Sequence, residues 1–488
     1  MGAIEDQKID YRLKWLVLTS VGMGIFLGTI DSSIVNIALP TMTRQFQANF
    51  ATVQWVVLAY LLTITTLMLG VSRLADIKGK KPIYITGFVI FTIGSLLCGL
   101  SHTISMLIVS RVLQGIGGTM ITSLGMAIIT ESFPPSERGR ALGLTSTIVS
   151  LGIVLGPTLG GVIIEHLSWN WIFFVNLPVG IVGIIMVMRF VPDIRPKGKQ
   201  RFDFPGAIIL FICLLTFLLA LTLGQRLGFT NQTVLFISII CILSLVVFII
   251  TELRTQQPMI ELRLFRDRFF SINLITRIIT FISIAGTLVL MPFYLENMLG
   301  YHTQQVGLMM AIVPIAVGII GPISGTLSDR FGNRLISVIG LATLVIGYVL
   351  VSTLSAETSI SGYLMRFFPI GLGMGIFQSP NNNAVMGSAT RERLGIMSGI
   401  LAISRTLGQT SGIAILGTIW ASRTFYYAGE VLAAGATEAP ITAQIAGLHD
   451  TFTGIIVIIS IALGLALWAL ADEYRSRKHR PEAHKNTN

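Results

Sequence analysis

The feature that most constrains this chain is a series of fourteen long apolar stretches. Each has about 18–27 residues, close to the roughly 20 that a helix needs to cross the hydrocarbon core of a bilayer. A membrane β-barrel would instead show alternating segments of about ten residues. The stretches cover 15–39, 53–71, 82–100, 104–130, 141–164, 170–190, 206–224, 233–250, 270–295, 305–327, 335–354, 363–386, 395–420 and 452–471. The sequence therefore predicts an all-α polytopic membrane protein with fourteen transmembrane helices.

Composition agrees with this prediction and excludes several kinds of protein. Of the 488 residues 53% are hydrophobic and only 12% are charged, whereas a soluble domain carries about 25% charged residues. No G-x-x-x-x-G-K-[ST] loop for nucleotide phosphates and no H-E-x-x-H motif is present. The three cysteines, Cys98, Cys213 and Cys241, fall within apolar stretches, which argues against a disulfide framework or a cysteine metal site. We therefore expect no cofactor, no metal and no enzymatic activity.

The distribution of lysine and arginine predicts the orientation in the membrane. With a cytoplasmic N-terminus, 27 of the 34 basic residues lie in inside segments, three lie in outside loops and four lie within spans. Excess positive charge marks cytoplasmic loops. We expect a multi-pass protein of a bacterial cell membrane with both termini cytoplasmic. The net charge of +11 then needs no nucleic acid partner, and the basic tail "RSRKHRPEAHK" is a topology anchor rather than a binding arm.

The chain contains a weak internal repeat. Leu74, Asp76 and Gly79, between the second and third stretches, recur 253 residues later between the tenth and eleventh. The recurring residues are Leu327, Asp329 and Gly332. Arg111 in the fourth stretch matches Arg366 in the twelfth. Gly156 and Gly160 in the fifth stretch match Gly408 and Gly412 in the thirteenth. Two such repeats around a site at the membrane midplane are the architecture of many secondary transporters.

The repeat predicts the domain organisation. We expect an N-terminal six-helix bundle in 1–200, two inserted helices with a cytoplasmic linker in 201–268, a C-terminal six-helix bundle in 269–471 and a basic cytoplasmic tail in 472–488. The longest outer loop, 423–451, lies between the last two stretches and has no assignable role.

Four motifs together carry a family resemblance. They are "TIDSSIVNIALP" (29–40), "SRLADIKGKK" (72–81), "RVLQGIGG" (111–118) and "GIVLGPTLGG" (152–161). The chain resembles the major facilitator superfamily, specifically its fourteen-span drug:proton antiporters, over nearly its whole length. The resemblance implies a proton-coupled secondary transporter that exports amphipathic, cationic drugs by alternating access and confers antibiotic resistance. Ser72 and Ile77 depart from the loop motif, where the family has glycine and arginine, although the second copy keeps Gly325 and Arg330.

The glycines of "GIVLGPTLGG" raise the question why a spanning helix carries helix-weakening residues. Gly152, Gly156 and Gly160 are four apart and share one helix face, and small residues let helix backbones approach closely. Pro157 frees a backbone carbonyl and bends the helix. We expect this face to pack against the opposite half of the protein, where the two halves move. The alternative is close packing with no mechanical role.

The loop motif is expected to control the conformational change. By resemblance, Asp76 and Gly79 act at the cytoplasmic side, where a carboxylate near a helix N-terminus is favoured by about 0.3–1 kcal/mol. Asp329, Arg330 and Gly332 are their second-copy counterparts. A solvated loop charge without a mechanical role is the alternative.

Charges within spans need a reason, because each costs roughly 2.5–3.5 kcal/mol at the bilayer centre. Asp31 is the only acidic residue deep in any span. It lies about 13 Å below the outer end of its helix, and Arg111 lies about 12 Å below the same face. The two side chains are thus expected to pair or to share a cavity, with Asp31 as the proton-responsive group and Arg111 as its modulator. A static pair that only fixes helix packing is the alternative.

Other polar residues within spans are candidates for a substrate cavity: Tyr60, Gln114, Gln378, Asn382 and Arg405. For each of them a hydrogen bond between helices is the competing explanation. The expected partners are protons, the lipid bilayer and a lipophilic small molecule, and we expect the protein to work as a monomer. The main alternative function is export of an endogenous metabolite, peptide or lipid precursor. A channel or a membrane enzyme is the more distant alternative.

Overall fold

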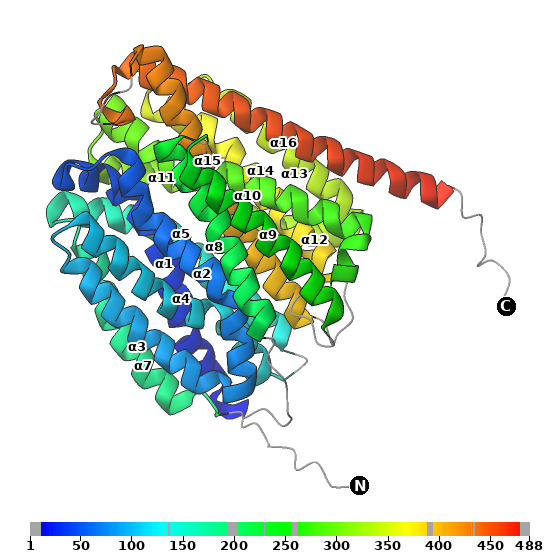
Figure 1. The fold of residues 1–488 in the computed structure, drawn as a ribbon. Helices are drawn as coiled ribbons and strands as arrows, with labels where there is room; N and C mark the ends of the chain where they lie inside the picture. Colours follow the sequence, from blue (N-terminus) through cyan, green and yellow to red (C-terminus); the bar gives the residue numbers. More distant parts are fainter. Residues whose placement is uncertain are drawn as a thin grey trace, which may run out of the picture. The chain divides into compact units, whose positions relative to one another are not determined.

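A computed structural model describes residues 11–134, 137–193, 204–228, 230–255, 262–387, 394–430, 432 and 435–478. These residues form helices and connecting turns, with no strand among them (Figure 1). The first six predicted spans correspond to α1 (Lys14–Phe46), α2 (Phe50–Lys78), α3 (Lys80–Gly99), α4 (Ile104–Ser132), α5 (Arg138–His166) and α6 (Trp171–Phe174) with α7 (Asn176–Phe190). The predicted all-helical membrane fold is confirmed for the described chain.

The remaining helices follow the predicted order. The inserted pair is α8 (Phe204–Leu227) and α9 (Gln232–Arg254). The second set is α10 (Arg268–Phe293), α11 (Thr303–Met310), α12 (Ile312–Phe331), α13 (Asn333–Val351), α14 (Ile360–Gly387), α15 (Leu394–Ala428) and α16 (Ile441–Lys478). A π-helical turn, Tyr294–Met298, follows Pro292 at the end of α10, where proline cannot donate a helical hydrogen bond.

Twelve of these helical segments are long and apolar enough to cross a membrane. The two predicted spans outside this set are 206–224 in α8 and 395–420 in α15. The stretch of α8 that qualifies as apolar, Pro205–Leu221, is shorter than a full span. α15 has 35 residues but carries a polar run, "SRTLGQTS" (404–411), which lowers its mean hydropathy. The structure therefore supports twelve apolar candidate spans, and fourteen remains a prediction.

The described chain divides into two compact units. Unit 1 comprises Met1–Met259 and Met291–Ala311, and unit 2 comprises Ile260–Leu290 and Ile312–Asn488. Segment 291–311, which the sequence placed in the C-terminal bundle, thus belongs to unit 1. The domain boundaries drawn from the repeat otherwise stay a prediction.

The same helix pairings occur in both units. In unit 1, α4 packs against α2 and α3, and α3 packs against α7; α3 and α7 lie side by side in Figure 1. In unit 2, α14 packs against α12 and α13, and α13 packs against α16. The inserted helices α8 and α9 pack against each other, and α8 also contacts α2. These pairings agree with two repeated helical bundles and an inserted helix pair.

The glycine face of α5 contacts α1, which corrects one expectation. A Cβ atom on Gly152 would lie 2.1 Å from Thr29 Oγ1, and one on Gly156 would lie 1.8 Å from Ser33 Oγ. Gly160 faces the α1 backbone and Ile34 in the same way. We predicted that this face meets the opposite six-helix half, but it packs within its own half. Periodicity identified the residues on the face and could not identify the helix opposite them.

Two other α5 residues contact a helix of the second predicted bundle. A Cβ atom on Gly307 of α11 would lie 2.2 Å from the Pro157 carbonyl oxygen, and one on Gly161 would lie 2.7 Å from the Thr303 carbonyl oxygen. Both contacts lie within unit 1. α5 is continuous through Pro157, so the proline does not break the helix. The close approach to the second bundle therefore depends on Gly161 and Gly307.

The second copy of the glycine motif packs in a matching way. In unit 2, a Cβ atom on Gly408 of α15 would lie 2.8 Å from the Ile278 carbonyl oxygen of α10, and one on Gly412 would lie 2.2 Å from that of Ile282. Thus α15 approaches α10 as α5 approaches α1. The predicted correspondence between the two glycine pairs is reproduced in the helix packing of each unit.

Candidate functional site

A buried ion pair lies on α1 and α4 of unit 1. Arg111 Nη1 lies 2.7 Å from Asp31 Oδ2, and both side chains are completely inaccessible to solvent. Arg111 Nε also donates to the Val56 carbonyl oxygen of α2 at 2.9 Å. The structure therefore brings together the two charges that the sequence placed at matching depth, and ties them to a third helix.

Three amide and hydroxyl groups complete the network around the carboxylate. Gln114 Nε2 donates to Asp31 Oδ1 at 2.8 Å and to Ser95 Oγ at 2.7 Å. Gln114 Oε1 accepts from Arg111 Nη1 at 2.6 Å. Asn176 Nδ2 donates to Asp31 Oδ1 at 3.2 Å. The Asp31 carboxylate therefore accepts hydrogen bonds from three residues, Arg111, Gln114 and Asn176.

Asn176 and Ser95 are the residues that sequence reasoning missed. Asn176 begins α7 and Ser95 lies in α3; both are buried. A single neutral polar residue in an apolar helix is common and gives no signal by itself. The network thus joins four helices, α1, α3, α4 and α7, with α2 contributing a carbonyl group.

An aromatic side chain covers the arginine. The Tyr60 ring of α2 lies 4.1 Å from the Arg111 guanidinium carbon, and the Phe173 ring lies 5.7 Å from it. A cation above a ring face is attracted to it, most strongly where water is excluded. The sequence assigned Tyr60 and Gln114 to a substrate cavity. Here both are buried and contact the ion pair.

Three buried polar atoms of this network lack a hydrogen-bond partner in the described structure. They are Arg111 Nη2, Asn176 Oδ1 and the Tyr60 hydroxyl oxygen. A buried donor or acceptor left unpaired costs about 1–3 kcal/mol. These three atoms therefore retain hydrogen-bonding capacity for a water molecule or a ligand.

Unit 2 contains a second buried cluster around Arg277 of α10. Its Nη1 donates to Asn382 Oδ1 of α14 at 2.5 Å, and its Nε donates to Ser404 Oγ of α15 at 3.1 Å. Arg405 of α15 lies over the Phe281 ring, 5.7 Å from its centroid. Gln378 lies one turn before Asn382 on the same face of α14 and is half-buried. Of the predicted cavity residues, three thus lie in this part of unit 2.

The predicted gating residues lie at two similar turns. Gly79 (φ +96°) separates α2 from α3, and Gly332 (φ +93°) separates α12 from α13. This region of backbone conformation strongly favours glycine. Asp329 and Arg330 are exposed at the end of α12, whereas the side chain of Asp76 lies outside the described part of the structure. The turn geometry repeats in both units, and the gating role remains a prediction.

An ion pair and a glutamate–histidine contact connect segments at the other end of unit 1. Arg44 of α1 pairs with Glu296, whose side chain is only 8% exposed. Glu165 of α5 lies 3.5 Å from His302 Nδ1. No sequence pattern indicated the partner of either glutamate.

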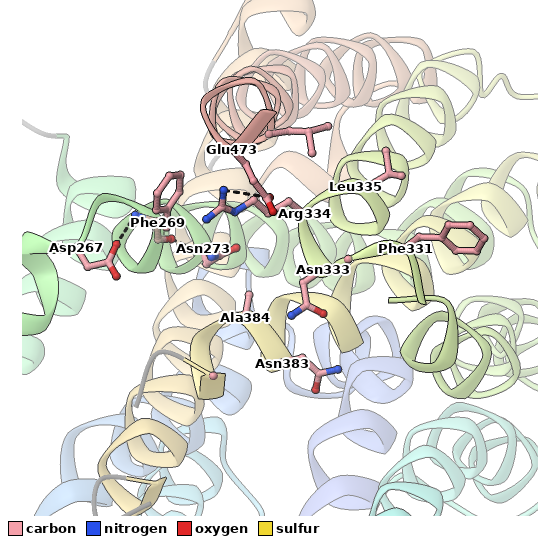
Figure 2. Close-up of a pocket in the computed structure, with 13 residues that line it drawn as sticks. Asp267, Phe269, Asn273, Phe331, Asn333, Arg334, Leu335, Asn383, Ala384 and Glu473 are labelled. Atoms are coloured by element: carbon pink, nitrogen blue, oxygen red, sulfur yellow. Dashed lines mark hydrogen bonds and ion pairs between the residues drawn. The ribbon is translucent and has the colours of Figure 1, made fainter. Parts of the chain in front are cut away.

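A separate pocket of about 370 Å³ lies in unit 2, beside the α12–α13 turn. Figure 2 shows Arg334 paired with Glu473 of α16; the two side chains are 3.1 Å apart, and the Arg334 guanidinium lies 3.7 Å above the Phe269 ring. The pair joins the start of α13 to α16, with α10 beside it. No sequence pattern predicted this pocket.

An all-helical chain with repeated helix pairings and buried charges on its spanning helices defines a membrane transport protein of the two-repeat class. Comparison with known families agrees with this conclusion. The chain matches the family model "Major Facilitator Superfamily" over residues 21–413. It therefore belongs to this family of transporters.

Relatives whose names indicate different functions align with most of the chain. It is 33% identical to the "Riboflavin transporter RibZ" of Clostridioides difficile over 416 residues, which are 85% of this chain and 90% of that protein. It is 32% identical to the "Multidrug resistance protein Stp" of Mycobacterium tuberculosis over 85% of this chain and 78% of that protein. It is 34% identical to the "Uncharacterized transporter YebQ" of Escherichia coli over 92% and 99%.

A solved structure with the same fold is a bacterial homologue of the human lysosomal transporter Spinster. It superimposes with a TM-score of 0.67 and 18% sequence identity, over 94% of this chain and 97% of that one. At this identity the likeness concerns the fold alone. The subfamily of fourteen-span drug:proton antiporters is not distinguished by these comparisons.

Proposed function

We propose that this protein is a proton-coupled secondary active transporter that exports amphipathic small molecules across a bacterial cell membrane. The observation that supports the proposal is the buried network of Asp31, Arg111 and Gln114 on α1 and α4. A buried carboxylate with an arginine partner is an arrangement that can couple the binding and release of a proton to a conformational change. The membrane potential supplies about 2.3 kcal/mol per charge per 100 mV, enough for more than a tenfold gradient.

Asp31 is proposed as the proton carrier because it is the only deep carboxylate in the spans. The Arg111 guanidinium stays protonated at physiological pH and cannot take this role. Burial favours the neutral carboxylic acid, and a neighbouring cation favours the carboxylate. When the network opens to water or loses contact with Arg111, the balance between these two influences changes, and so does proton occupancy.

The test uses purified protein in sealed proteoliposomes with an imposed proton gradient and ethidium as the transported dye. We expect Asp31→Asn to abolish accumulation against a gradient and to retain exchange down a gradient. Asp450→Asn is the matched control, since that carboxylate pairs with Arg423 near the outer end of α16, and it should transport normally. Normal accumulation by Asp31→Asn would show that another group carries the proton, with Glu296 and Glu165 as the next candidates. Flux that never accumulates dye in the unmodified protein would instead support a channel.

The membrane topology is part of the proposal. α8 and α15 are proposed to cross the membrane along with the twelve apolar segments, giving fourteen spans, two cytoplasmic termini and a monomeric transporter. The support is that α8 pairs with the spanning α9 and that α15 repeats the packing of α5.

Loss of the proposed gating carboxylate, Asp76→Asn, should slow transport and leave substrate affinity unchanged.

Export of an endogenous metabolite is the second candidate. The relative named as a riboflavin transporter favours it, whereas relatives named as multidrug resistance and export proteins favour the first. Expression in a pump-deficient bacterium with a panel of lipophilic cations distinguishes the two. A rise in resistance to several cations supports drug export, and no change for any of them favours a metabolite.

A further inference from the structure

Unit 2 holds two arginines whose charges have no acidic partner in the described part of the chain. Arg277 is 4% exposed and donates to Asn382 Oδ1, Ser404 Oγ and the Leu401 carbonyl oxygen, all of which are neutral. Arg405 has one described contact, the face of Phe281, and that same ring also lies 5.0 Å from the Arg277 guanidinium carbon. Two positive charges therefore share one aromatic ring.

The sequence supplies no carboxylate near these arginines. The acid nearest Arg277 in sequence on the N-terminal side is Asp267, which directly precedes α10 and lies about 15 Å from Arg277 along the helix axis. The acids nearest Arg405 in sequence lie beyond the two ends of α15. Asp267 also accepts hydrogen bonds from the amides of Phe269 and Phe270 at the start of α10. Among the described residues, neither charge has a carboxylate partner of the kind that Asp31 provides for Arg111 in unit 1.

The surroundings indicate what could neutralise them. Guanidinium groups bind carboxylate and phosphate in bidentate geometry, and the buried Phe281 ring, whose centroid lies 5.0 and 5.7 Å from the two guanidinium carbons, makes the surroundings of both charges apolar. Gln378 lies one turn from Asn382 on α14, and its side-chain amide can both donate and accept hydrogen bonds. We infer that Arg277 and Arg405 form a binding site for the acidic group of an amphipathic organic anion that carries an aromatic or other apolar ring.

This inference rests on the proposed transport function and specifies its substrate class. It disagrees with the expectation of cationic cargo, because two uncompensated arginines repel a cation. Asn382 and Ser404 hold Arg277 in place, so that Arg277 is the fixed half of the site. Arg405 has no polar partner among the described residues, and its loss should affect ligand affinity most directly.

The experiment measures binding of three pyrene derivatives that differ only in their end group. Purified full-length protein in phosphatidylcholine nanodiscs is titrated with 1-pyrenebutyrate, 1-pyrenebutanol and 1-pyrenebutylamine, with empty nanodiscs subtracted. We expect the carboxylate to bind at least tenfold more tightly than the alcohol, and the amine to bind no better than the alcohol. A charge-assisted hydrogen bond of ordinary strength gives a preference of this size.

Two substitutions and a matched control link the preference to the site. Arg405→Gln should reduce affinity for pyrenebutyrate about tenfold and leave affinity for pyrenebutanol unchanged. Arg277→Gln should do the same, and melting curves without ligand report whether it folds. Arg366→Gln is the control, because this arginine of the same unit bonds to Thr353 and to its own helix, and it should bind like the unmodified protein.

A second set of nanodiscs identifies the source of the acidic group. In these nanodiscs, phosphatidylglycerol makes up one third of the lipid. If it competes with pyrenebutyrate, the site takes an anionic lipid headgroup. If it does not compete, the site takes a soluble organic anion. Either result supports the acid site. Equal affinity for the three pyrenes, or an unchanged preference in a folded Arg405→Gln protein, overturns it. Binding needs no gradient, so failure here leaves the proposed proton-driven export intact, and failed export leaves the site intact.

Discussion

Removing both charges of the Asp31–Arg111 pair should destabilise the protein by less than the sum of the two single losses. Three donors surround the carboxylate: Arg111 Nη1 at 2.7 Å, Gln114 Nε2 at 2.8 Å and Asn176 Nδ2 at 3.2 Å. In Asp31→Asn one oxygen becomes an NH₂ group that faces a donor, and the arginine stays buried without its counter-ion. Breaking a buried pair in this way costs about 3–5 kcal/mol. Arg111→Gln leaves a buried carboxylate and should cost a similar amount.

The double variant Asp31→Asn, Arg111→Gln removes both charges together. Because no uncompensated charge remains, its loss of stability should be smaller than the sum of the two single losses by about 2 kcal/mol or more, within the range of coupling energies for residues in contact. The assay is the unfolding midpoint in detergent, followed by near-ultraviolet circular dichroism. The partly exposed pair Arg423–Asp450 provides the control cycle, in which each single substitution should change the unfolding midpoint little, because water screens an exposed ion pair.

The same proteins distinguish a proton carrier from a static pair. If the pair only fixes helix packing, the double variant recovers both stability and active transport. If Asp31 carries the proton, the double variant recovers stability and still fails to accumulate substrate. Additive losses of stability, within about 0.5 kcal/mol, would refute the reasoning that the two charges depend on each other for burial.

Two further predictions concern residues in contact with α5 and α4. Gly307→Ala should lower the unfolding midpoint and slow transport, because its Cβ would lie 2.2 Å from the Pro157 carbonyl oxygen, whereas Gly321→Ala has open space around its Cβ and should change neither. Tyr60→Phe should leave stability and transport unchanged, because the buried hydroxyl has no described hydrogen-bond partner. Tyr60→Leu removes the aromatic ring that lies over Arg111 and should reduce stability by about 0.5–2 kcal/mol. The same unfolding assay measures both effects.

The helices were predictable from the sequence, and their ends were not. A long apolar run in a bilayer must form a helix, because no water is present to hydrogen-bond an exposed backbone. Hydropathy, however, marks where a helix is apolar and not where it stops. α16 runs from Ile441 to Lys478, whereas the apolar stretch covers only 452–471, because its polar ends continue as helix beyond the apolar part.

The candidate site was predictable only where a charge marked it. Asp31 and Arg111 are rare residues in apolar helices, and counting from one membrane face placed them at one depth. Ser95 and Asn176 join the same network and are neutral, so no rule of composition separates them from other polar residues in spans. The sequence likewise could not predict which helix packs against the α5 glycines, because a periodic face can pack against any neighbouring helix.

The charges within spans illustrate why sequence alone leaves the mechanism open. Arg111 and Arg277 look alike in the sequence, each an arginine inside an apolar stretch. The structure separates them by their partners: a carboxylate for Arg111, and an amide, a hydroxyl and a carbonyl for Arg277. An arginine neutralised by the chain can modulate a proton site, whereas an arginine without a counter-ion attracts an anion from outside the chain. The residue type fixes the charge, and the three-dimensional neighbours decide which of these two tasks it can perform.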